Sequence, residues 1–370
     1  MKLSCNQTLL SRALNVTGKA VSSRTTIPIL KGILLEATAD GFLKLSASDL
    51  DISIEKKIPV TVTEPGSIVV SASLFTDIIK MLPSGEVEIT VDETNQVTVQ
   101  CLTSEYSIVG QSAEEFPGTG EIKENETFVF DKTRFQDMIR KTAFAASVDE
   151  SKGIIVGILI ELSEGEMSMV ALDGFRMAVA RDQAANIKNK KIIIAARILN
   201  EVQKILSDLD DSAEITLVLD EKRGVIAAED TKIVIRLLEG DFIRYKDILP
   251  KDHKCRVKAN RRELADSIER ASVMARKGKN NLIKLTISDE KILISSRSEE
   301  GFVREELFVE KEGDDLEIGF NAKFILDVLK VVSDEEIIID LNTSISPCLI
   351  KPMEGNAFEY LILPVRISGN

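Results

Sequence analysis

Hydrophobic residues along the chain follow two spacings that alternate in blocks. In the segments 10–14, 135–139 and 264–268, apolar or small residues recur at i, i+3, i+4 and i+7, which predicts amphipathic helices. In segments such as 42–47 and 86–91, apolar and polar residues alternate, which is typical of half-buried strands. Because helices and hairpins follow each other in blocks with short connections, we expect an α+β fold with mainly antiparallel sheets.

The blocks recur along the chain as an internal repeat. The hairpin strand at 31–36 returns at 156–161, a displacement of 125 residues, and a third, less similar hairpin lies at 283–295. The helix that precedes each hairpin returns after 125 and then after 129 residues. Self-similarity at a fixed displacement indicates tandem copies of one structural unit. The chain is therefore predicted to contain three similar α+β units.

A second helix recurs in each copy, and an alternating strand follows it at 86–91, 213–218 and 336–341. The helix carries an acidic residue followed three positions later by a lysine: Asp77 and Lys80, Glu201 and Lys204, Asp327 and Lys330. Each unit is thus expected to run helix, strands, helix, strands.

Linkers separate the three units. The segments 116–126 and 249–253 are rich in glycine, proline and charged residues, as expected between domains. A chain of 370 residues is also too long for one ordinary hydrophobic core. The predicted domains are 1–120, 127–249 and 252–370.

The composition limits the compartment and the kind of protein. Residues 1–6 contain no apolar stretch typical of a secretory signal, and no apolar run approaches the roughly 20 residues that span a bilayer. We therefore expect a cytoplasmic protein without membrane attachment. The four cysteines are too widely spaced for a disulfide scaffold or a C-x-x-C zinc pair. They are Cys5, Cys101, Cys255 and Cys348.

Residues with the chemistry of an active site are scarce. His253 is the only histidine and lies in a polar linker, without a second imidazole for a zinc site. Gly18 and Lys19 do not form a P-loop, because Ala13 and Ala20 stand where that motif needs Gly and Ser or Thr. The acidic cluster 208–211 is typical of a solvated turn. We expect no catalytic residue, no metal and no cofactor; an enzyme with a carboxylate site between domains is the disfavoured alternative.

Positive charge is concentrated in the predicted helices. The chain carries a formal net charge of −13, but the six predicted helices sum to +9, so the remainder carries −22. For any single basic residue, a solvated helix face is the ordinary interpretation. Lys80, Lys204 and Lys330 nevertheless occupy equivalent places in three units, so a rotational arrangement would align them. A basic face amid acidic surroundings would attract phosphates without sequence preference. The candidate DNA-facing residues are Arg12, Arg24, Lys80, Lys141, Arg197, Lys204, Arg270, Lys323 and Lys330.

Four short segments resemble one family when taken in order. They are the stretches 26–30, 172–178, 240–250 and 360–367, which read TIPIL, LDGFRMA, GDFIRYKDILP and YLILPVRI. Together with the three tandem units, they resemble the bacterial sliding clamp, the β subunit of DNA polymerase III. The resemblance covers essentially the whole chain.

The resemblance implies a head-to-tail homodimeric ring of six domains, with helices lining a central hole for duplex DNA and sheets outside. It implies a non-enzymatic processivity factor that tethers the replicative polymerase, the clamp loader, and repair polymerases or ligase through linear peptides. Such a protein would act at the nucleoid. The alternative is a repeat scaffold that binds peptides without encircling DNA.

The resemblance also implies two protein-binding surfaces. In the dimer interface, Tyr106 would meet Val273 and Met274 of the partner, although these two residues could instead belong to a helix core. A peptide pocket between the second and third domains would bury an apolar anchor, and Arg176 or Arg366 would bind a carbonyl or carboxylate. Ile155 and Ile345 fit core and pocket equally well. The implied pocket residues are Ile155, Leu172, Gly174, Phe175, Arg176, Met177, Ile243, Ile248, Phe324, Ile345, Leu363, Pro364, Val365 and Arg366.

The chain departs from the family pattern at the rim of this pocket. Phe175 stands where His is common, Ile243 where Pro is common, and Asp247 where Arg is common in one branch. These residues make the pocket surroundings more apolar and more acidic, so the preferred peptide is expected to differ. Residues 368–370 extend beyond the usual end and would shade the pocket or be disordered.

Overall fold

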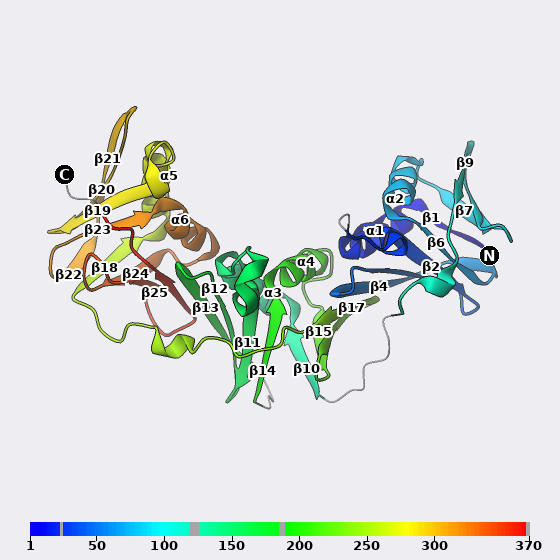
Figure 1. Cartoon of the computed structure of the whole chain (residues 1–370), viewed down its shortest axis with the longest axis horizontal. Helices are drawn as coiled ribbons and strands as arrows, with labels where there is room; N and C mark the ends of the chain where they lie inside the picture. The colour runs from blue at the N-terminus through cyan, green and yellow to red at the C-terminus, as the bar shows by residue number, and fades with distance from the viewer. Residues whose placement is uncertain (23–24, 119–125, 185–188, 368–370) are drawn as a thin grey trace. The chain divides into compact units, whose positions relative to one another are not determined.

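The computed structural model describes residues 1–22, 25–118, 126–184 and 189–367. Arg24 and the extension 368–370 lie outside the described residues. The secondary-structure elements repeat three times along the chain in the predicted order (Figure 1). In the first repeat they are β1 (Lys2–Asn6), α1 (Gln7–Thr17), β2 (Gly32–Thr38), β3 (Phe42–Ser48), β4 (Ile52–Pro59), β5 (Thr61–Glu64), β6 (Gly66–Ser71), α2 (Ala72–Met81), β7 (Glu86–Val91), β8 (Gln96–Cys101) and β9 (Ser104–Val109).

The second and third repeats follow the same plan. The second contains β10 (Glu126–Asp131), α3 (Lys132–Thr142), β11 (Gly157–Ser163), β12 (Glu166–Leu172), β13 (Arg176–Gln183), β14 (Lys190–Ala195), α4 (Ala196–Leu206), β15 (Glu214–Leu219), β16 (Arg223–Ala228) and β17 (Thr231–Arg236). The third contains β18 (Cys255–Asn260), α5 (Arg261–Ala275), β19 (Leu282–Ser288), β20 (Lys291–Ser298), β21 (Gly301–Phe308), β22 (Glu310–Gly313), β23 (Leu316–Asn321), α6 (Ala322–Val331), β24 (Glu336–Leu341), β25 (Cys348–Pro352) and β26 (Phe358–Ile362).

Strand register confirms the repeat residue by residue. Gly32 opposes Ser71, and Gly157 opposes Ala195. Leu282 of the third repeat opposes Asn321 in the same way. Each opposing residue directly precedes the second helix of its repeat. The hairpin and the second helix therefore stand in the same geometric relation in all three copies.

Local sequence explains where the helices begin. Asn6 precedes α1, and its side chain accepts hydrogen bonds from the backbone amides of the first turn at 3.0 and 3.2 Å. Asn260 caps α5 in the same way. An asparagine cap satisfies amides that have no partner within the helix. The predicted core residues Leu10, Phe135 and Leu264 are fully buried, which confirms the apolar stripe of the first helices.

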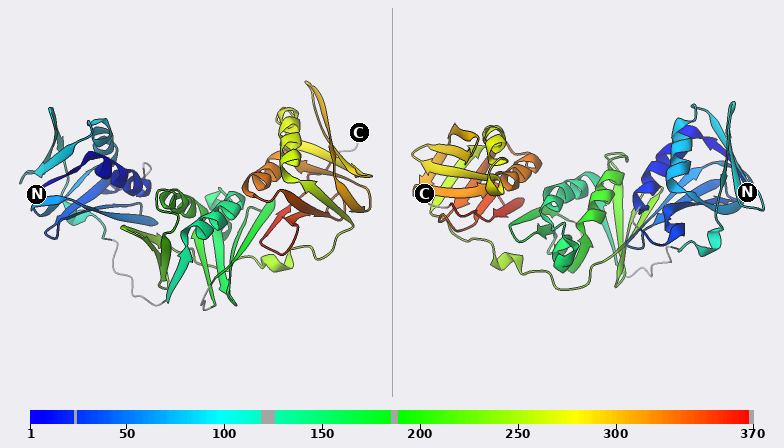
Figure 2. Two further views of the ribbon diagram at one scale, coloured as in Figure 1. Left: turned by 180° about the vertical axis from the view of Figure 1, so that it is seen from behind. Right: turned by 45° about the horizontal axis from the view of Figure 1, so that its top comes forward.

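The chain forms two compact units, each described here by itself. Unit 1 combines Met1–Thr133 with Glu201–Leu237. It contains a five-stranded sheet in the order β5-β1-β7-β8-β9 and an eight-stranded sheet in the order β10-β15-β16-β17-β4-β3-β2-β6. Helices α1 and α2 pack side by side, and α1 contacts strands of both sheets (Figure 2).

Unit 2 combines Arg134–Asn200 with Leu238–Asn370. It contains a nine-stranded sheet in the order β14-β11-β12-β13-β26-β25-β24-β18-β22 and a four-stranded sheet in the order β21-β20-β19-β23. Helices α5 and α6 pack side by side, and α5 contacts β20 and β21 (Figure 2). Every strand pair in both units is antiparallel, as expected from the sequence.

The two units do not coincide with the three repeats, because neighbouring repeats share sheets. Strand β17 of the second repeat pairs with β4 of the first, where Ile233 opposes Ile54. Strand β26 of the third repeat pairs with β13 of the second, where Tyr360 opposes Ala178. We call these two strand pairs the seams. Each seam extends a backbone hydrogen-bond ladder across a predicted domain boundary, which the hydrophobic pattern alone does not reveal.

The described residues contain neither a membrane-spanning helix nor a cluster of metal-binding side chains. Within them, no helix has both the length and the hydropathy needed to cross a membrane. Among the same residues, no cluster of three or more His, Cys, Asp or Glu side chains is placed to hold a metal ion. The four cysteines are free thiols buried in the core.

Candidate functional site

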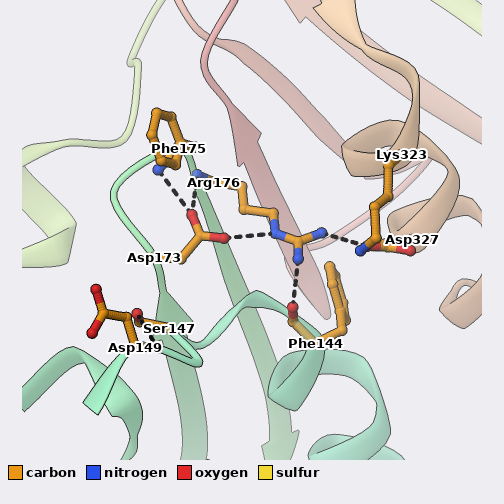
Figure 3. Close-up of polar contacts among 8 residues, drawn as sticks. All are labelled: Phe144, Ser147, Asp149, Asp173, Phe175, Arg176, Lys323 and Asp327. Atoms are coloured by element: carbon orange, nitrogen blue, oxygen red, sulfur yellow. Dashed lines mark hydrogen bonds and ion pairs between the residues drawn. The ribbon is translucent and has the colours of Figure 1, made fainter. Parts of the chain in front are cut away.

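The turn that joins β12 to β13 presents the first candidate pocket residues. The Asp173 carboxylate accepts hydrogen bonds from the backbone amides of Phe175 at 2.8 Å and Arg176 at 3.1 Å (Figure 3). Gly174 between them has φ of 93°, a conformation that glycine adopts without strain. This tight turn holds the Phe175 ring outward, with 55% of the residue exposed.

The Arg176 side chain is buried and fully engaged within the protein. Its guanidinium donates to the Asp173 carboxylate at 3.0 Å, to the Asp327 carboxylate at 2.7 Å and to the Phe144 carbonyl at 2.7 Å (Figure 3). The guanidinium also lies 4.7 Å from the Phe324 ring centroid, a favourable cation–π distance. These contacts tie three segments of unit 2 together, and the expectation that Arg176 binds a peptide carbonyl or carboxylate stays a prediction. Arg366 is exposed and keeps that expectation.

Two phenylalanines form the rim of the candidate pocket. The Phe175 and Phe324 rings stack with centroids 6.2 Å apart and planes inclined by 26°. The Lys152 ammonium nitrogen lies 5.7 Å from the centroid of the Phe175 ring. Phe175 comes from the β12–β13 turn and Phe324 from the first turn of α6, so the rim joins the second repeat to the third. We call this pair the aromatic rim.

An apolar cluster at the ends of β12 and β13 that flank the turn between them brings several predicted residues together. Leu172 and Met177 are buried in it with Tyr245 and Leu361, and Ile155 packs against it from a partly buried position. Leu172 and Met177 oppose each other across β12 and β13. For Ile155 the structure therefore shows a position intermediate between core and surface.

The connection between the second and third repeats is fixed to this cluster by a buried carboxylate. The Tyr245 hydroxyl donates to Glu161 at 2.8 Å, and Glu161 also pairs with Lys191 at 2.8 Å and Lys246 at 3.2 Å. Burial opposes ionisation, but these donors outweigh it and lower the pKa of Glu161 to about 2. Burial and the neighbouring carboxylate raise the pKa of Tyr245, so its hydroxyl stays a donor.

The fixed turn sets the positions of two exposed isoleucines. Tyr245–Asp247 forms a single 3-10 turn, and its amides bond back to the carbonyls of residues 243 and 244. Ile243 and Ile248 flank this turn and are 42% and 45% exposed. Apolar side chains held open to solvent on both sides of a rigid turn are suited to contact a partner.

The C-terminal segment completes the set of predicted pocket residues. The Leu363 amide donates to the Phe175 carbonyl at 2.9 Å, and the Val365 amide donates to the Gly319 carbonyl at 2.8 Å. Leu363 is partly exposed, while Pro364 and Val365 are half-buried. Ile345 lies in the turn before β25 with 73% exposure, so the alternative that it belongs to the core is wrong.

The candidate DNA-facing residues differ in solvent exposure and in their pairing with carboxylates. Lys80, Lys204 and Lys330 each lie in the last turn of their helix, which confirms their equivalence. Arg270 is bound to Glu305 at 2.6 Å. Lys141 pairs with Asp137 at 2.6 Å, and its side chain is only 18% exposed. The exposed members are Arg12, Lys80, Arg197, Lys204, Arg270, Lys323 and Lys330.

The candidate interface residues lie at two sheet edges. Tyr106 is on β9, the edge strand of the five-stranded sheet, and is 40% exposed. Val273 on α5 is 60% exposed, so the alternative of a core residue is wrong for it. Met274 lies against the β20–β21 hairpin, where the Ser298 hydroxyl is 2.9 Å from its sulfur. The large exposed side chains Phe302 and Phe308 of β21 were not predicted from the sequence.

Sequence reasoning also missed polar residues that organise the candidate pocket. Glu161 lies inside an otherwise buried strand, and a charged residue in such a strand is a usable signal of a buried ion pair. Asp327 gave no such signal, because its place in the acid–lysine pattern suggested a solvated helix face. Its contact with Arg176, 151 residues away, depends on tertiary structure alone.

Comparison with known proteins agrees with this architecture. Three family models of the DNA polymerase III beta subunit match consecutive parts of the chain: the N-terminal domain matches residues 1–120, the central domain 130–243 and the C-terminal domain 246–366. The protein named beta sliding clamp from Bacillus subtilis (strain 168) is 35% identical over 379 residues, covering 99% of this chain and 100% of that protein.

Solved structures give the same result. The DNA polymerase sliding clamp from Bacillus subtilis is 34% identical with a TM-score of 0.96, and 100% of both chains is covered. A Pseudomonas aeruginosa sliding clamp bound to griselimycin is 26% identical with a TM-score of 0.94, covering 99% of this chain and 100% of that one. The chain belongs to the DNA polymerase III beta subunit family, the beta sliding clamps.

Proposed function

We propose that this DNA sliding clamp closes as a head-to-tail homodimeric ring around duplex DNA and tethers DNA-processing proteins through a peptide pocket in unit 2. It acts as a processivity factor by holding its partners on DNA, and its own residues catalyse no reaction. The three domains are 1–120, 127–249 and 252–370, a division supported by the spans of the matching family models.

The observation that carries this proposal is the rule by which repeats join at the seams. In each seam, the last strand of one repeat pairs antiparallel with a strand of the repeat before it. That strand is the third one after the first helix, so β17 pairs with β4, and β26 pairs with β13. The equivalent last strand of the first repeat is β9, and the equivalent third strand of the last repeat is β21. Both are edge strands in the described part of the chain. By the same rule, β9 of one copy would pair with β21 of a second copy, and β21 of the first with β9 of the second, which closes a ring.

The side chains at these two edges suit such a contact. Tyr106 on β9 and Phe302 on β21 are exposed aromatic residues, and Val273 lies on the helix that packs against β21. Long edge strands with exposed apolar side chains are rare in monomeric proteins because they invite pairing. Residues of both edges thus form the proposed dimer interface, together with Met274.

The exposed helix residues are proposed to contact DNA phosphates. Their positive charge contrasts with the net charge of −13 of the whole chain. Contacts limited to phosphates carry no sequence information and are weakened by salt, so they allow sliding. The exposed residues Arg12, Arg197, Arg270 and Lys323 join the three equivalent lysines in this proposal. It also includes the half-buried Lys141 and, outside the described residues, Arg24.

The aromatic rim and the apolar cluster of Leu172 and Met177 are proposed to receive the peptide. An apolar pocket with a few fixed polar groups is the usual form of a peptide or ligand site. The proposed occupants are linear segments of a replicative polymerase, a clamp loader, and repair polymerases or ligase. Griselimycin, to which a Pseudomonas aeruginosa clamp is bound, is a candidate small ligand of this chain.

Retention on DNA of different topology tests the proposal. The clamp, loaded onto nicked circular DNA, is expected to stay bound at high salt and to be lost when the circle is linearised. Substitution of Lys80, Lys204 and Lys330 by Gln should flatten the salt dependence of duplex binding by roughly 3 in log–log slope per chain. Equal substitutions at the exposed Lys57, Lys251 and Lys254 provide the control. Equal retention on circular and linear DNA would exclude encirclement and leave the peptide-binding scaffold.

A further inference from the structure

One carboxylate oxygen of Asp327 accepts hydrogen bonds from two cations with different proposed roles. The Arg176 guanidinium donates to Asp327 Oδ2 at 2.7 Å, and the Lys323 ammonium donates to the same oxygen at 2.8 Å (Figure 3). Arg176 holds the candidate peptide pocket, whereas Lys323 is a candidate DNA-facing residue. The two proposed functions therefore meet at a single atom.

The two cations differ strongly in their access to solvent. The Arg176 side chain is 8% exposed, the Asp327 side chain 21% and the Lys323 side chain 62%. A buried guanidinium needs its carboxylate partners, because desolvated charge is costly when it is unpaired. An exposed lysine in an i, i+4 pair is held weakly and can turn to another anion. Lys323 is thus the exchangeable partner, and Arg176 is the fixed one.

Asp327 also connects Arg176 to the aromatic rim through helix α6. Phe324, one half of the rim, lies one turn before Asp327 on this helix. Asn321 caps the same turn by accepting a hydrogen bond from the Lys323 amide at 3.0 Å. The contact between Arg176 and Asp327 therefore holds the first turn of α6 against the β12–β13 turn, where Phe175 meets Phe324. Any change in that contact acts directly on the rim.

We propose that Asp327 is a positioning residue of the peptide pocket, and that it links the occupancy of the pocket to DNA contact at Lys323. This inference rests on the proposed function. When Lys323 turns to a DNA phosphate, Arg176 becomes the only cation at Asp327 Oδ2 and its contact strengthens. The aromatic rim is then held more firmly, and peptide binds more tightly. By reciprocity, bound peptide favours the release of Lys323 to DNA by the same factor.

The magnitude of this linkage follows from the exposure of Lys323. Exposed helix pairs are weak, so duplex DNA should tighten peptide binding only about twofold. Loss of the Asp327 charge should be larger, because it removes a charged partner from a buried guanidinium. Asp327→Asn should weaken peptide binding about tenfold.

The experiment measures the affinity of the full-length clamp for a short fluorescent peptide with leucine and phenylalanine anchors. Affinity is measured with and without a short blunt duplex at low ionic strength, and an alanine version of the peptide controls for specificity. Wild type is compared with Asp327→Asn, Lys323→Gln and Lys330→Gln. Lys330 is the matched control, because it lies on the same helix and its side chain is also 62% exposed, but its nearest carboxylate is Glu269 at 3.8 Å.

The expected result is a twofold tightening by DNA in wild type and in Lys330→Gln, which is lost in Lys323→Gln and in Asp327→Asn. A purely structural role of Asp327 would change peptide affinity without making the DNA effect depend on Lys323. The inference is overturned if Lys323→Gln and Lys330→Gln behave alike, a comparison that stands even if Asp327→Asn folds poorly. Failure of wild type to bind the peptide at all would instead remove the proposed function.

Discussion

At the scale of single residues, Glu161 shows how a buried charge can organise a recognition surface. Its carboxylate lies in β11, yet it holds the Tyr245 turn that carries the exposed isoleucines of the candidate pocket. Its two lysine partners are largely exposed, with 69% and 68% of their side chains accessible. The lysines can therefore rehydrate when the carboxylate is removed, whereas the Tyr245 hydroxyl loses this acceptor.

Replacement of Glu161 by Gln tests this anchor through its dependence on pH. The folded-state pKa of about 2 lies below the ordinary value of 4.5, so Glu161 stabilises the fold above pH 4.5 and loses that effect as the pH falls towards 2. We expect Glu161→Gln to lower the free energy of unfolding by about 2 kcal/mol at neutral pH. In urea denaturation, the difference from wild type should shrink towards pH 2. A difference that stays constant with pH would contradict the assignment.

At the scale of elements, two glycines show why the first hairpin is repeated so faithfully. A β-carbon on Gly32 would lie 2.4 Å from Val69 Cγ1, and one on Gly157 would lie 2.5 Å from Ile193 Cγ2. Neither glycine has a positive φ, so the requirement is for space. Leu282 occupies the equivalent position of the third repeat, which explains in part why that hairpin resembles the others least.

Alanine at these positions should therefore destabilise the chain by overpacking. We expect Gly157→Ala and Gly32→Ala each to lower the free energy of unfolding by roughly 1 to 3 kcal/mol. Gly18→Ala is the matched control, because no atom lies within 4 Å of its added β-carbon and its backbone is helical, so it should not destabilise the chain. Chemical denaturation of the three variants measures the effect. Equal stabilities in all three would show that neighbouring side chains yield freely.

The elements themselves could be predicted from the sequence, because periodicity reports which face of a segment is buried. The helices and main hairpins were confirmed. The short strands β5 and β22 were missed, since a four-residue strand with at most one apolar side chain is too short to show a period. The polar contacts of Arg176 could not be predicted either, because they join residues far apart in sequence. Hydrophobic pattern determines local structure, whereas such pairings depend on three-dimensional proximity.

At the scale of the whole molecule, the proposed dimer depends on the two edge strands β9 and β21. Tyr106→Lys on β9 or Phe302→Lys on β21 should place charge in the proposed interface and weaken self-association at least tenfold. Val129→Lys is the control, because Val129 is also exposed on an edge strand, β10. Light scattering during gel filtration gives the mass of each variant. A wild-type mass equal to one chain, or dissociation by Val129→Lys alone, would contradict the proposed dimer.

The shared sheets at the two seams have a consequence for how such a ring fails. A seam inside one chain is an intramolecular joint, so its strands re-form contact at a local concentration that dilution cannot change. In the proposed dimer, the joint between β9 and β21 uses the same ladder without a covalent tether. Its occupancy therefore follows mass action. On dilution the circle breaks only where one polypeptide ends and the next begins, and each half keeps its own joints intact.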